Sequence, residues 1–334
     1  MFEGFDFHAF FEEIRNKKVL IIGDVMIDTY FWGNVDRVSP EAPVPIVSEI
    51  IEENRLGGAA NVALNIKSLG AVPILCSVIG GDDRANVFLD LLEEQNLSDV
   101  GITVDEYRIT TQKTRVISGF KHLLRIDEEI GSSLAKRVQD EFVEKVLSLM
   151  ETGGINAVIF QDYDKGVITP QVISRVNKVA LRKDIPVMAD PKFRNFKKYK
   201  DSTIFKPNLK EFVKGCKTDA TKKDIEKLTA TGERFRQEQN IRILMITLSD
   251  EGILVLEKDA QHYIPSVKRH ITDVSGAGDT VISVAALCHA CGLSAAQTGT
   301  IANLAGGLVC EKSGVVPIKK EQLEKECGEL LVEH

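Results

Sequence analysis

The sequence has no apolar run long enough to cross a membrane and no excess of basic charge. Its 334 residues are 43% hydrophobic, yet none of the runs approaches the ~20 apolar residues that a membrane helix requires. Lysine and arginine number 42 against 49 aspartates and glutamates. Nucleic acids and anionic membranes are bound by basic surfaces, so neither is expected as a partner.

Cysteine is scarce and scattered, which argues against a disulfide-stapled scaffold. Of six cysteines, only Cys288 and Cys291 have C-x-x-C spacing, and a second pair of ligands for a metal is missing. Both lie in the apolar run 281–293, so buried helix thiols are favoured over a redox or metal site. We expect the chain to work in a reducing cytoplasm.

Several familiar catalytic signatures are also missing. The chain has no G-x-x-x-x-G-K-[ST], H-E-x-x-H or G-x-S-x-G segment and no H-R-D and D-F-G pair, which disfavours the enzyme classes that use them. It also has no internal repeat, low-complexity tract or Gly/Ser linker that would mark a domain boundary. A single large domain is therefore preferred.

Short β-branched runs alternate with longer helical patterns along the chain. Continuous apolar strands separated by helices are typical of a mostly parallel sheet covered on both faces, so the expected fold class is α/β. The expected strands are residues 19–22, 74–79, 157–160, 186–189, 204–205 and 243–247.

Two stretches depart from this alternation. Residues 30–50 are β-rich and broken by three prolines, and residues 107–126 alternate around Gly119 like a hairpin. They are expected to form either a small β-stranded lid over one end of the sheet or ordinary edge strands. The pattern alone does not choose between the two.

The segment from Asp273 to Asp279 (DVSGAGD) is a turn of small residues that leads into an apolar helical run. Backbone N–H groups in such a turn can converge on an anion, and the following helix points its positive end at the same place. Asp279 falls in the first helical turn. It either caps the helix or acts as a general base on a substrate hydroxyl during phosphoryl transfer, and local chemistry leaves both roles open.

A second glycine-rich segment, LGGAAN, also precedes a helix. Gly57 and Gly58 would let a ligand approach the backbone, and Asn61 can both donate to and accept from sugar hydroxyls; alternatively, Asn61 caps a tight helix entry. Asp24 and Asp28 follow the first strand, where open α/β sheets bind their ligands. Their carboxylates can accept hydrogen bonds from a polyol.

These segments resemble the signatures of the ribokinase-like (PfkB) carbohydrate kinases. Residues 57–63, followed by Gly70 and Gly80, resemble the first signature, and residues 273–279 resemble the second. An N-x-x-E motif, Asn208 to Glu211, lies between them, so the resemblance covers most of the chain. It implies a ribokinase-like fold with a lid.

The resemblance also implies roles for individual residues. Asp279 is then the base. The positions that match sugar contacts are Asp24, Asp28, Gly57, Gly58 and Asn61. The anion hole is formed by the backbone of Gly276, Ala277 and Gly278. Mg²⁺ would be organised, through its waters, by Asn208 and Glu211, which on pattern alone are a polar helix start. ATP contacts are implied for Thr247, Ser249, Gly252 and Asn303.

Within this family the chain is most similar to the heptose-phosphate kinases of lipopolysaccharide precursor synthesis. That similarity implies transfer of the ATP γ-phosphoryl group to the C1 hydroxyl of D-glycero-D-manno-heptose 7-phosphate, giving the 1,7-bisphosphate. Some members carry a fused nucleotidyltransferase domain, whose H-x-G-H motif this chain lacks, so a kinase domain alone is expected over residues 1–334. The most similar segments are residues 23–47, 55–71, 113–127, 161–166 and 189–192.

A sugar phosphate requires positive charge that a neutral sugar does not. Lys165 and Lys192 follow expected strands, and Arg115 and Arg125 lie in the candidate lid; each of them alone is more often a solvated side chain. Two alternatives stay open: another acceptor, such as fructose, ribose or a hexose phosphate, or a catalytically silent sugar-binding module. Exposed lid strands with free edges predict a homodimer through the lid.

Overall fold

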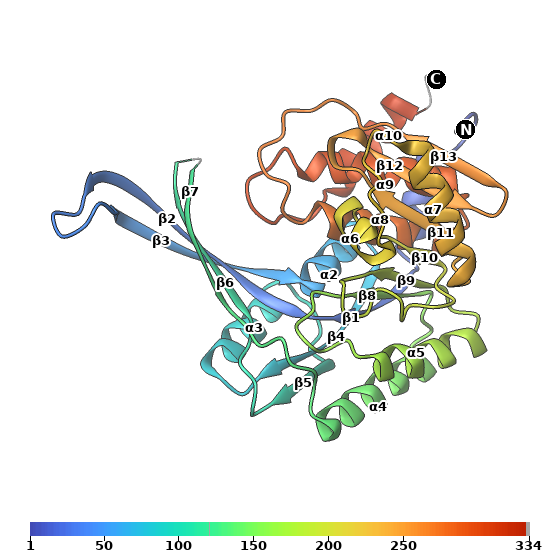
Figure 1. The fold of residues 1–334 in the computed structure, drawn as a ribbon. Helices are drawn as coiled ribbons and strands as arrows, with labels where there is room; N and C mark the ends of the chain where they lie inside the picture. The colour runs from blue at the N-terminus through green and yellow to red at the C-terminus, as the bar shows by residue number, and fades with distance from the viewer. Residues whose placement is uncertain (120, 332–334) are drawn as a thin grey trace.

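The computed structural model describes residues 1–119 and 121–331. A nine-stranded sheet forms its centre (Figure 1). The seven strands from β11 to β5 pair in parallel with one another, whereas β12 pairs antiparallel with β11 and with β13. This confirms the α/β fold class. The strand order is β13 (Ala260–Ile264), β12 (Ile253–Glu257), β11 (Ile243–Thr247), β10 (Ile204–Phe205), β9 (Val187–Asp190), β8 (Ala157–Gln161), β1 (Lys18–Gly23), β4 (Val72–Gly80) and β5 (Gly101–Asp105).

Helices cover both faces of this sheet, so strands such as β8 are buried on both sides. One buried cluster joins the sheet to α1 (Phe7–Ile14), α2 (Ala59–Ser68), α3 (Asp83–Glu94), α8 (Ala277–Ala290), α9 (Ala295–Val309) and α10 (Lys320–Leu331). The other joins it to α4 (Lys136–Thr152), α5 (Pro170–Arg182), α6 (Leu209–Cys216) and α7 (Ile225–Glu238). Cys288 is buried in α8, as expected, and Cys291 is half-buried just after it.

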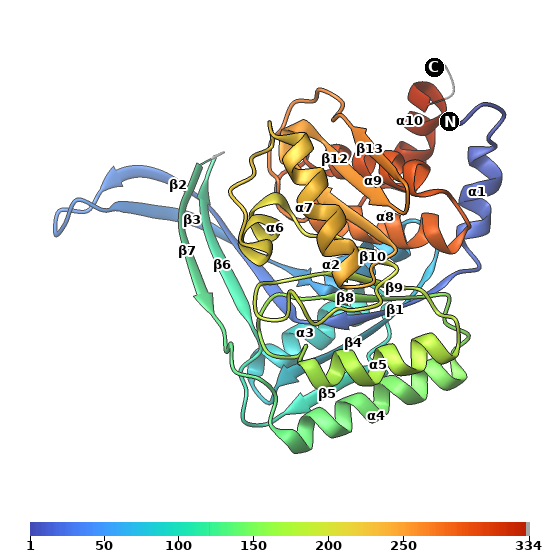
Figure 2. The ribbon, with the colours of Figure 1, turned by 45° about the vertical axis from the view of Figure 1, so that its right-hand side comes forward.

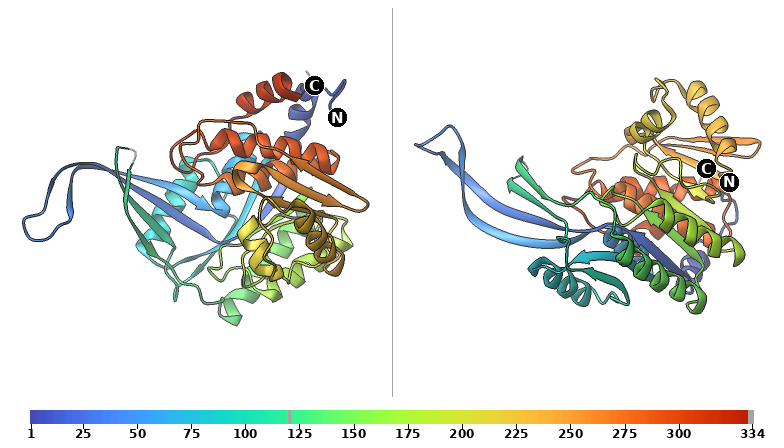
Figure 3. Two further views of the ribbon diagram at one scale, coloured as in Figure 1. Left: turned by 45° about the horizontal axis from the view of Figure 1, so that its top comes forward. Right: turned by 60° about the horizontal axis from the view of Figure 1, so that its bottom comes forward.

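A separate four-stranded sheet projects from the body (Figures 1 and 2), so the lid interpretation is confirmed over edge decoration. Its order is β3 (Pro45–Gly58), β2 (Val25–Val38), β6 (Gln112–Ser118) and β7 (Lys121–Glu128). The β2–β3 hairpin reaches furthest from the helices (Figure 3). The first lid segment spans residues 25–58 rather than 30–50, and the strands of the second span 112–128 rather than 107–126. The first begins early because residues 25–27 are apolar and buried and continue the pattern of β1.

The carboxyl ends of β1, β8, β9, β10 and β11 meet at one edge of the central sheet. β1 pairs with β4 on one side and with β8 on the other, so the order of the strands reverses at β1. Open α/β sheets bind ligands at such a switch point. Gly23 ends β1 so close to Gln161 that a Cβ there would collide with the Gln161 carbonyl oxygen. No helix within the described ranges is both long and apolar enough to span a bilayer.

Candidate active site

Asp279 lies at this switch point, in the first turn of α8. Its Oδ2 accepts a hydrogen bond from Asn61 Nδ2 (2.7 Å), and its Oδ1 accepts from Gln161 Nε2 (3.0 Å) and from the Tyr163 hydroxyl (2.7 Å). The N-cap of α8 is Gly276, so the interpretation of Asp279 as a helix cap is wrong. Its carboxylate instead joins α2, β8 and the loop after β8.

The surroundings of Asp279 raise its affinity for a proton. The residue is 4% exposed, and burial raises its pKa to about 6, although the hydrogen bonds from Asn61 and Tyr163 lower it. Asp190 raises the pKa further and Lys206 lowers it. A buried carboxylate whose pKa is raised to about 6 suits proton transfer near neutral pH.

The turn before Asp279 is built of small residues because other groups lie close to its backbone. Gly276 has a φ of 82°, and a Cβ there would lie 3.0 Å from Asn61 Nδ2. A Cβ on Gly278 would lie 3.5 Å from Lys206 Nζ, which pairs with Asp190 at 3.0 Å. The helix N-terminus and a buried ammonium group therefore face the same place, an arrangement that favours an anion.

Asp24 holds the loop that carries Tyr163. Its carboxylate accepts hydrogen bonds from the backbone N–H groups of Tyr163 (2.9 Å), Lys165 (3.1 Å) and Val167 (3.0 Å). Burial raises its pKa to about 6, with a further contribution from Asp162. The structure thus places Asp24 beneath the predicted sugar site, where its carboxylate organises the loop.

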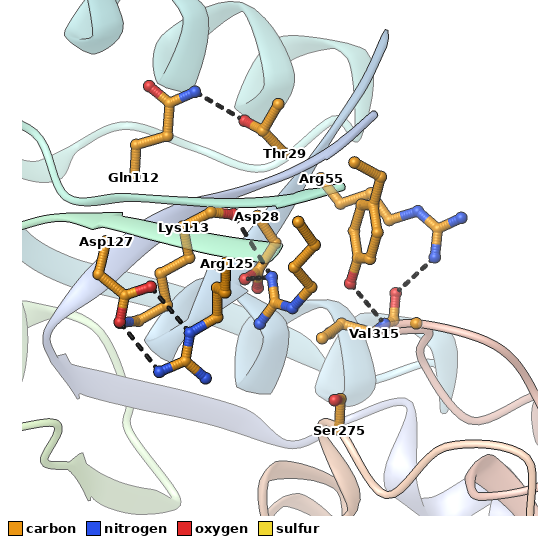
Figure 4. A network of polar contacts seen from close by, with 12 residues as sticks. Asp28, Thr29, Arg55, Gln112, Lys113, Arg125, Asp127, Ser275 and Val315 are labelled. Carbon is orange, nitrogen blue, oxygen red and sulfur yellow. Dashed lines mark hydrogen bonds and ion pairs between the residues drawn. The ribbon is translucent and has the colours of Figure 1, made fainter. Parts of the chain in front are cut away.

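Asp28 lies at the base of the lid (Figure 4). Its Oδ1 pairs with the guanidinium of Arg115 at 2.5 Å. A Cβ on Gly57 would collide with Asp28 Oδ2, and Gly58, with a φ of 61°, packs against the Asp24 carbonyl. These two glycines therefore permit close packing of β3 on β2. Gly58 is the N-cap of α2 and makes no side-chain cap bond, so the interpretation of Asn61 as the cap is wrong.

The four predicted phosphate-binding side chains do not form one cluster. Strand pairing sets Arg115 opposite Arg125, but Arg125 turns to Asp127 at 2.9 Å (Figure 4). Lys165 pairs at 2.7 Å with Glu129, just past β7. Lys192 pairs with Glu211 and lies over the ring of Tyr163, 5.3 Å from its centroid, beside Asp279 rather than in the lid.

The predicted Mg²⁺ and nucleotide residues follow β10 and β11. Asn208 and Glu211 form a capping box at the start of α6, each side chain bonded to the other residue's backbone N–H at 2.9 Å, which confirms the polar helix start. Thr247 ends β11 and bridges to Asn208, and Ser249 opens the next turn. Gly252 packs against residues 264–266, and Asn303 donates to the Pro265 carbonyl at 2.9 Å.

Sequence reasoning missed four residues at the centre of this site: Gln161, Tyr163, Asp190 and Lys206. The segments QDYDKG and ADPK pointed only to their lysines, although Gln161 and Asp190 end buried strands. Lys206 follows the buried strand β10 directly and is 2% exposed. A charged residue immediately after a buried strand was the available signal.

The fold and this site together define a carbohydrate kinase. The family described as pfkB family carbohydrate kinase matches residues 16–321, so the chain belongs to this family of phosphotransferases, which use ATP. The resemblance of the two glycine-rich signatures is thereby confirmed.

The chain is similar in sequence to proteins described as bifunctional. It is 36% identical to "Bifunctional protein HldE" of Geotalea uraniireducens over 326 residues, and 37% identical to that of Citrifermentans bemidjiense over 321 residues. These matches cover 97% and 96% of this chain but only 65% of each relative. The chain therefore spans about two thirds of the length of these relatives.

Solved structures share the fold at much lower identity. Phosphofructokinase-2 from Escherichia coli in complex with potassium superimposes with a TM-score of 0.76 at 16% identity, over 94% of this chain and 99% of that one. The same enzyme in complex with fructose-6-phosphate gives 0.75 at 16% identity, over the same shares of the two chains. These likenesses confirm the ribokinase-like architecture.

Proposed function

We propose that this chain transfers the γ-phosphoryl group of ATP to the C1 hydroxyl of D-glycero-D-manno-heptose 7-phosphate. The product is the 1,7-bisphosphate, an intermediate of ADP-heptose synthesis for the lipopolysaccharide core. The similarity to the HldE proteins over nearly the whole chain supports this acceptor, as do the sequence segments shared with heptose-phosphate kinases. Residues 1–334 would act as a single kinase domain with its lid, in the cytoplasm.

The observation that carries the proposal is the position of Asp279. Its carboxylate is buried, has a pKa raised to about 6 by burial, and lies directly after the Gly276–Gly278 turn. In this function Asp279 takes the proton of the C1 hydroxyl as the phosphoryl group arrives. The backbone of Gly276, Ala277 and Gly278 and the ammonium of Lys206 stabilise the charge on that group.

The residues around β10 and β11 fit a nucleotide and its magnesium ion. Mg²⁺ prefers one or two carboxylates together with phosphate oxygens and water, and no group of three His, Cys, Asp or Glu within residues 1–119 and 121–331 forms a cage for a metal. Glu211, with Asn208 beside it, would hold the ion through water. When bound, Mg²⁺ neutralises charge on the phosphates. Thr247, Ser249, Gly252 and Asn303 would line the nucleotide.

The sugar phosphate would lie between the switch point and the base of the lid. Asn61 of α2 and Asp28 of β2 would contact the sugar there, and Asp24 supports the loop that carries Tyr163. Movement of the lid would bring its basic side chains onto the substrate and exclude water. The candidates for the 7-phosphate are Arg115, Arg125, Lys165 and Lys192. The exposed lid also offers the surface for a homodimer.

The test is ADP release with Mg-ATP against a panel of acceptors. The panel holds heptose 7-phosphate, unphosphorylated heptose, fructose, ribose and fructose 6-phosphate, and Asp279→Asn is the control variant. The proposal predicts turnover with heptose 7-phosphate that is lost in the variant. Preference for another sugar would replace the acceptor, and no turnover with any sugar would favour a silent sugar-binding module.

A further inference from the structure

The two oxygens of the Asp279 carboxylate are not equivalent. Among the described residues, Oδ1 accepts two hydrogen bonds, from Gln161 and Tyr163, whereas Oδ2 accepts one, from Asn61. A carboxylate oxygen has two lone pairs for such bonds. Oδ1 is therefore saturated in this structure, and Oδ2 retains one free position.

Tyr163 is held firmly at Oδ1. Its backbone N–H donates to Asp24 Oδ2 at 2.9 Å, so a buried carboxylate fixes its main chain. Lys192 Nζ lies over its ring, 5.3 Å from the centroid. Burial, together with the charge of Asp279, raises the pKa of Tyr163 well above its usual value, so the phenol keeps its proton and remains a donor.

We propose that Tyr163 is a positioning residue for phosphoryl transfer: with Gln161 it occupies Oδ1 of Asp279 and directs the acceptor hydroxyl to Oδ2, beside Asn61. This inference rests on the proposed role of Asp279 as the base. It also assigns a role to Asp24, because the Asp24 carboxylate holds the Tyr163 backbone N–H while the Tyr163 hydroxyl bonds to Asp279. The reactive atom is thereby Oδ2, the oxygen that faces Asn61 of α2.

Tyr163 also tunes the base that it orients. The charged groups that face Asp279 are Asp190 at the end of β9, Lys192 in the loop after β9 and Lys206 directly after β10. Asp190 opposes the ionised carboxylate and the two lysines favour it, and the phenol adds a neutral donor that stabilises the charged form. Removing the phenol hydroxyl therefore raises the pKa of Asp279.

The test compares Tyr163→Phe with Tyr199→Phe. Tyr199 offers a matched control, because its hydroxyl donates at 2.6 Å to a different buried carboxylate, Asp162, rather than to Asp279. For Tyr163→Phe we expect kcat to fall about tenfold through lost orientation and the acid limb of the kcat profile to move up by about one pH unit. The KM for ATP should not change. Tyr199→Phe should leave the acid limb where it is in the wild type.

The outcomes separate this inference from the function on which it rests. If Asp279→Asn abolishes turnover but the profile of Tyr163→Phe superimposes on that of the wild type, the positioning role is overturned and the base is retained. An equal displacement in Tyr199→Phe would also overturn it, because the effect would then be a general loss of packing. Near-wild-type turnover in Asp279→Asn would overturn both.

Discussion

Two buried carboxylates at the ends of this site differ in what holds them. Asp28, at the base of the lid, is 3% exposed and paired with the guanidinium of Arg115, and Gly57 packs against its other oxygen. Asp279 is 4% exposed and held by three neutral donors. Burial raises the pKa of both. One carboxylate is therefore neutralised by a cation at the base of the lid, whereas the other is held by neutral donors alone.

The largest effect in this comparison is expected from Asp279→Asn. Asparagine keeps the shape but removes the base, so kcat should fall by about two to four orders of magnitude, with little change in melting temperature. In Asp28→Asn, by contrast, kcat should fall less than about tenfold. Steady-state kinetics with heptose 7-phosphate and thermal unfolding of both variants would measure this. Equal losses of kcat would contradict the division of roles.

The next effect is on stability. Arg115→Met leaves the charge of Asp28 buried without its partner, which should lower the free energy of unfolding by about 3 kcal/mol. Urea denaturation would measure it. The double variant Asp28→Asn with Arg115→Met removes both charges and should recover more than half of the loss. A single-variant loss below about 1 kcal/mol would mean that the pair behaves like a surface ion pair.

The fold was largely predictable because its signal is local. Strands such as β8 are buried along their whole length and show as continuous apolar runs between helices. The lid boundary was harder, because β2 begins with apolar residues, two positions after β1 ends. Only Asp24 separates the two strands, and the change of sheet depends on packing that no local pattern records.

The site was only partly predictable for the same reason. The glycine turn and Asp279 are adjacent in sequence, so their chemistry could be recognised together. The role of Tyr163 depends on hydrogen bonds to residues 116 and 139 positions away in the chain. Its segment was noticed, but nothing within it indicates that the phenol, rather than the lysine, reaches the base.

A third prediction concerns pH. Asp279 must be ionised to accept a proton, and burial raises its pKa to about 6, so kcat/KM should fall about tenfold between pH 7 and pH 5. Burial also raises the pKa of Asp24 to about 6. Tyr163→Phe distinguishes the two carboxylates, because the Tyr163 hydroxyl bonds to Asp279 and not to Asp24. An acid limb near pH 4 in the wild type would contradict the assignment.

The smallest effect should come from an exposed ion pair of the lid. Arg125 is 60% exposed and pairs with Asp127, so Arg125→Ala should change the free energy of unfolding by less than about 1 kcal/mol, in contrast to Arg115→Met. If Arg125 meets the 7-phosphate when the lid closes, the KM for heptose 7-phosphate should rise severalfold with kcat nearly unchanged. The KM for unphosphorylated heptose is the internal control, because this sugar has no 7-phosphate for Arg125 to contact. Equal rises for both sugars would show that Arg125 acts on the lid itself, and the phosphate would then have to be held by basic side chains nearer the switch point.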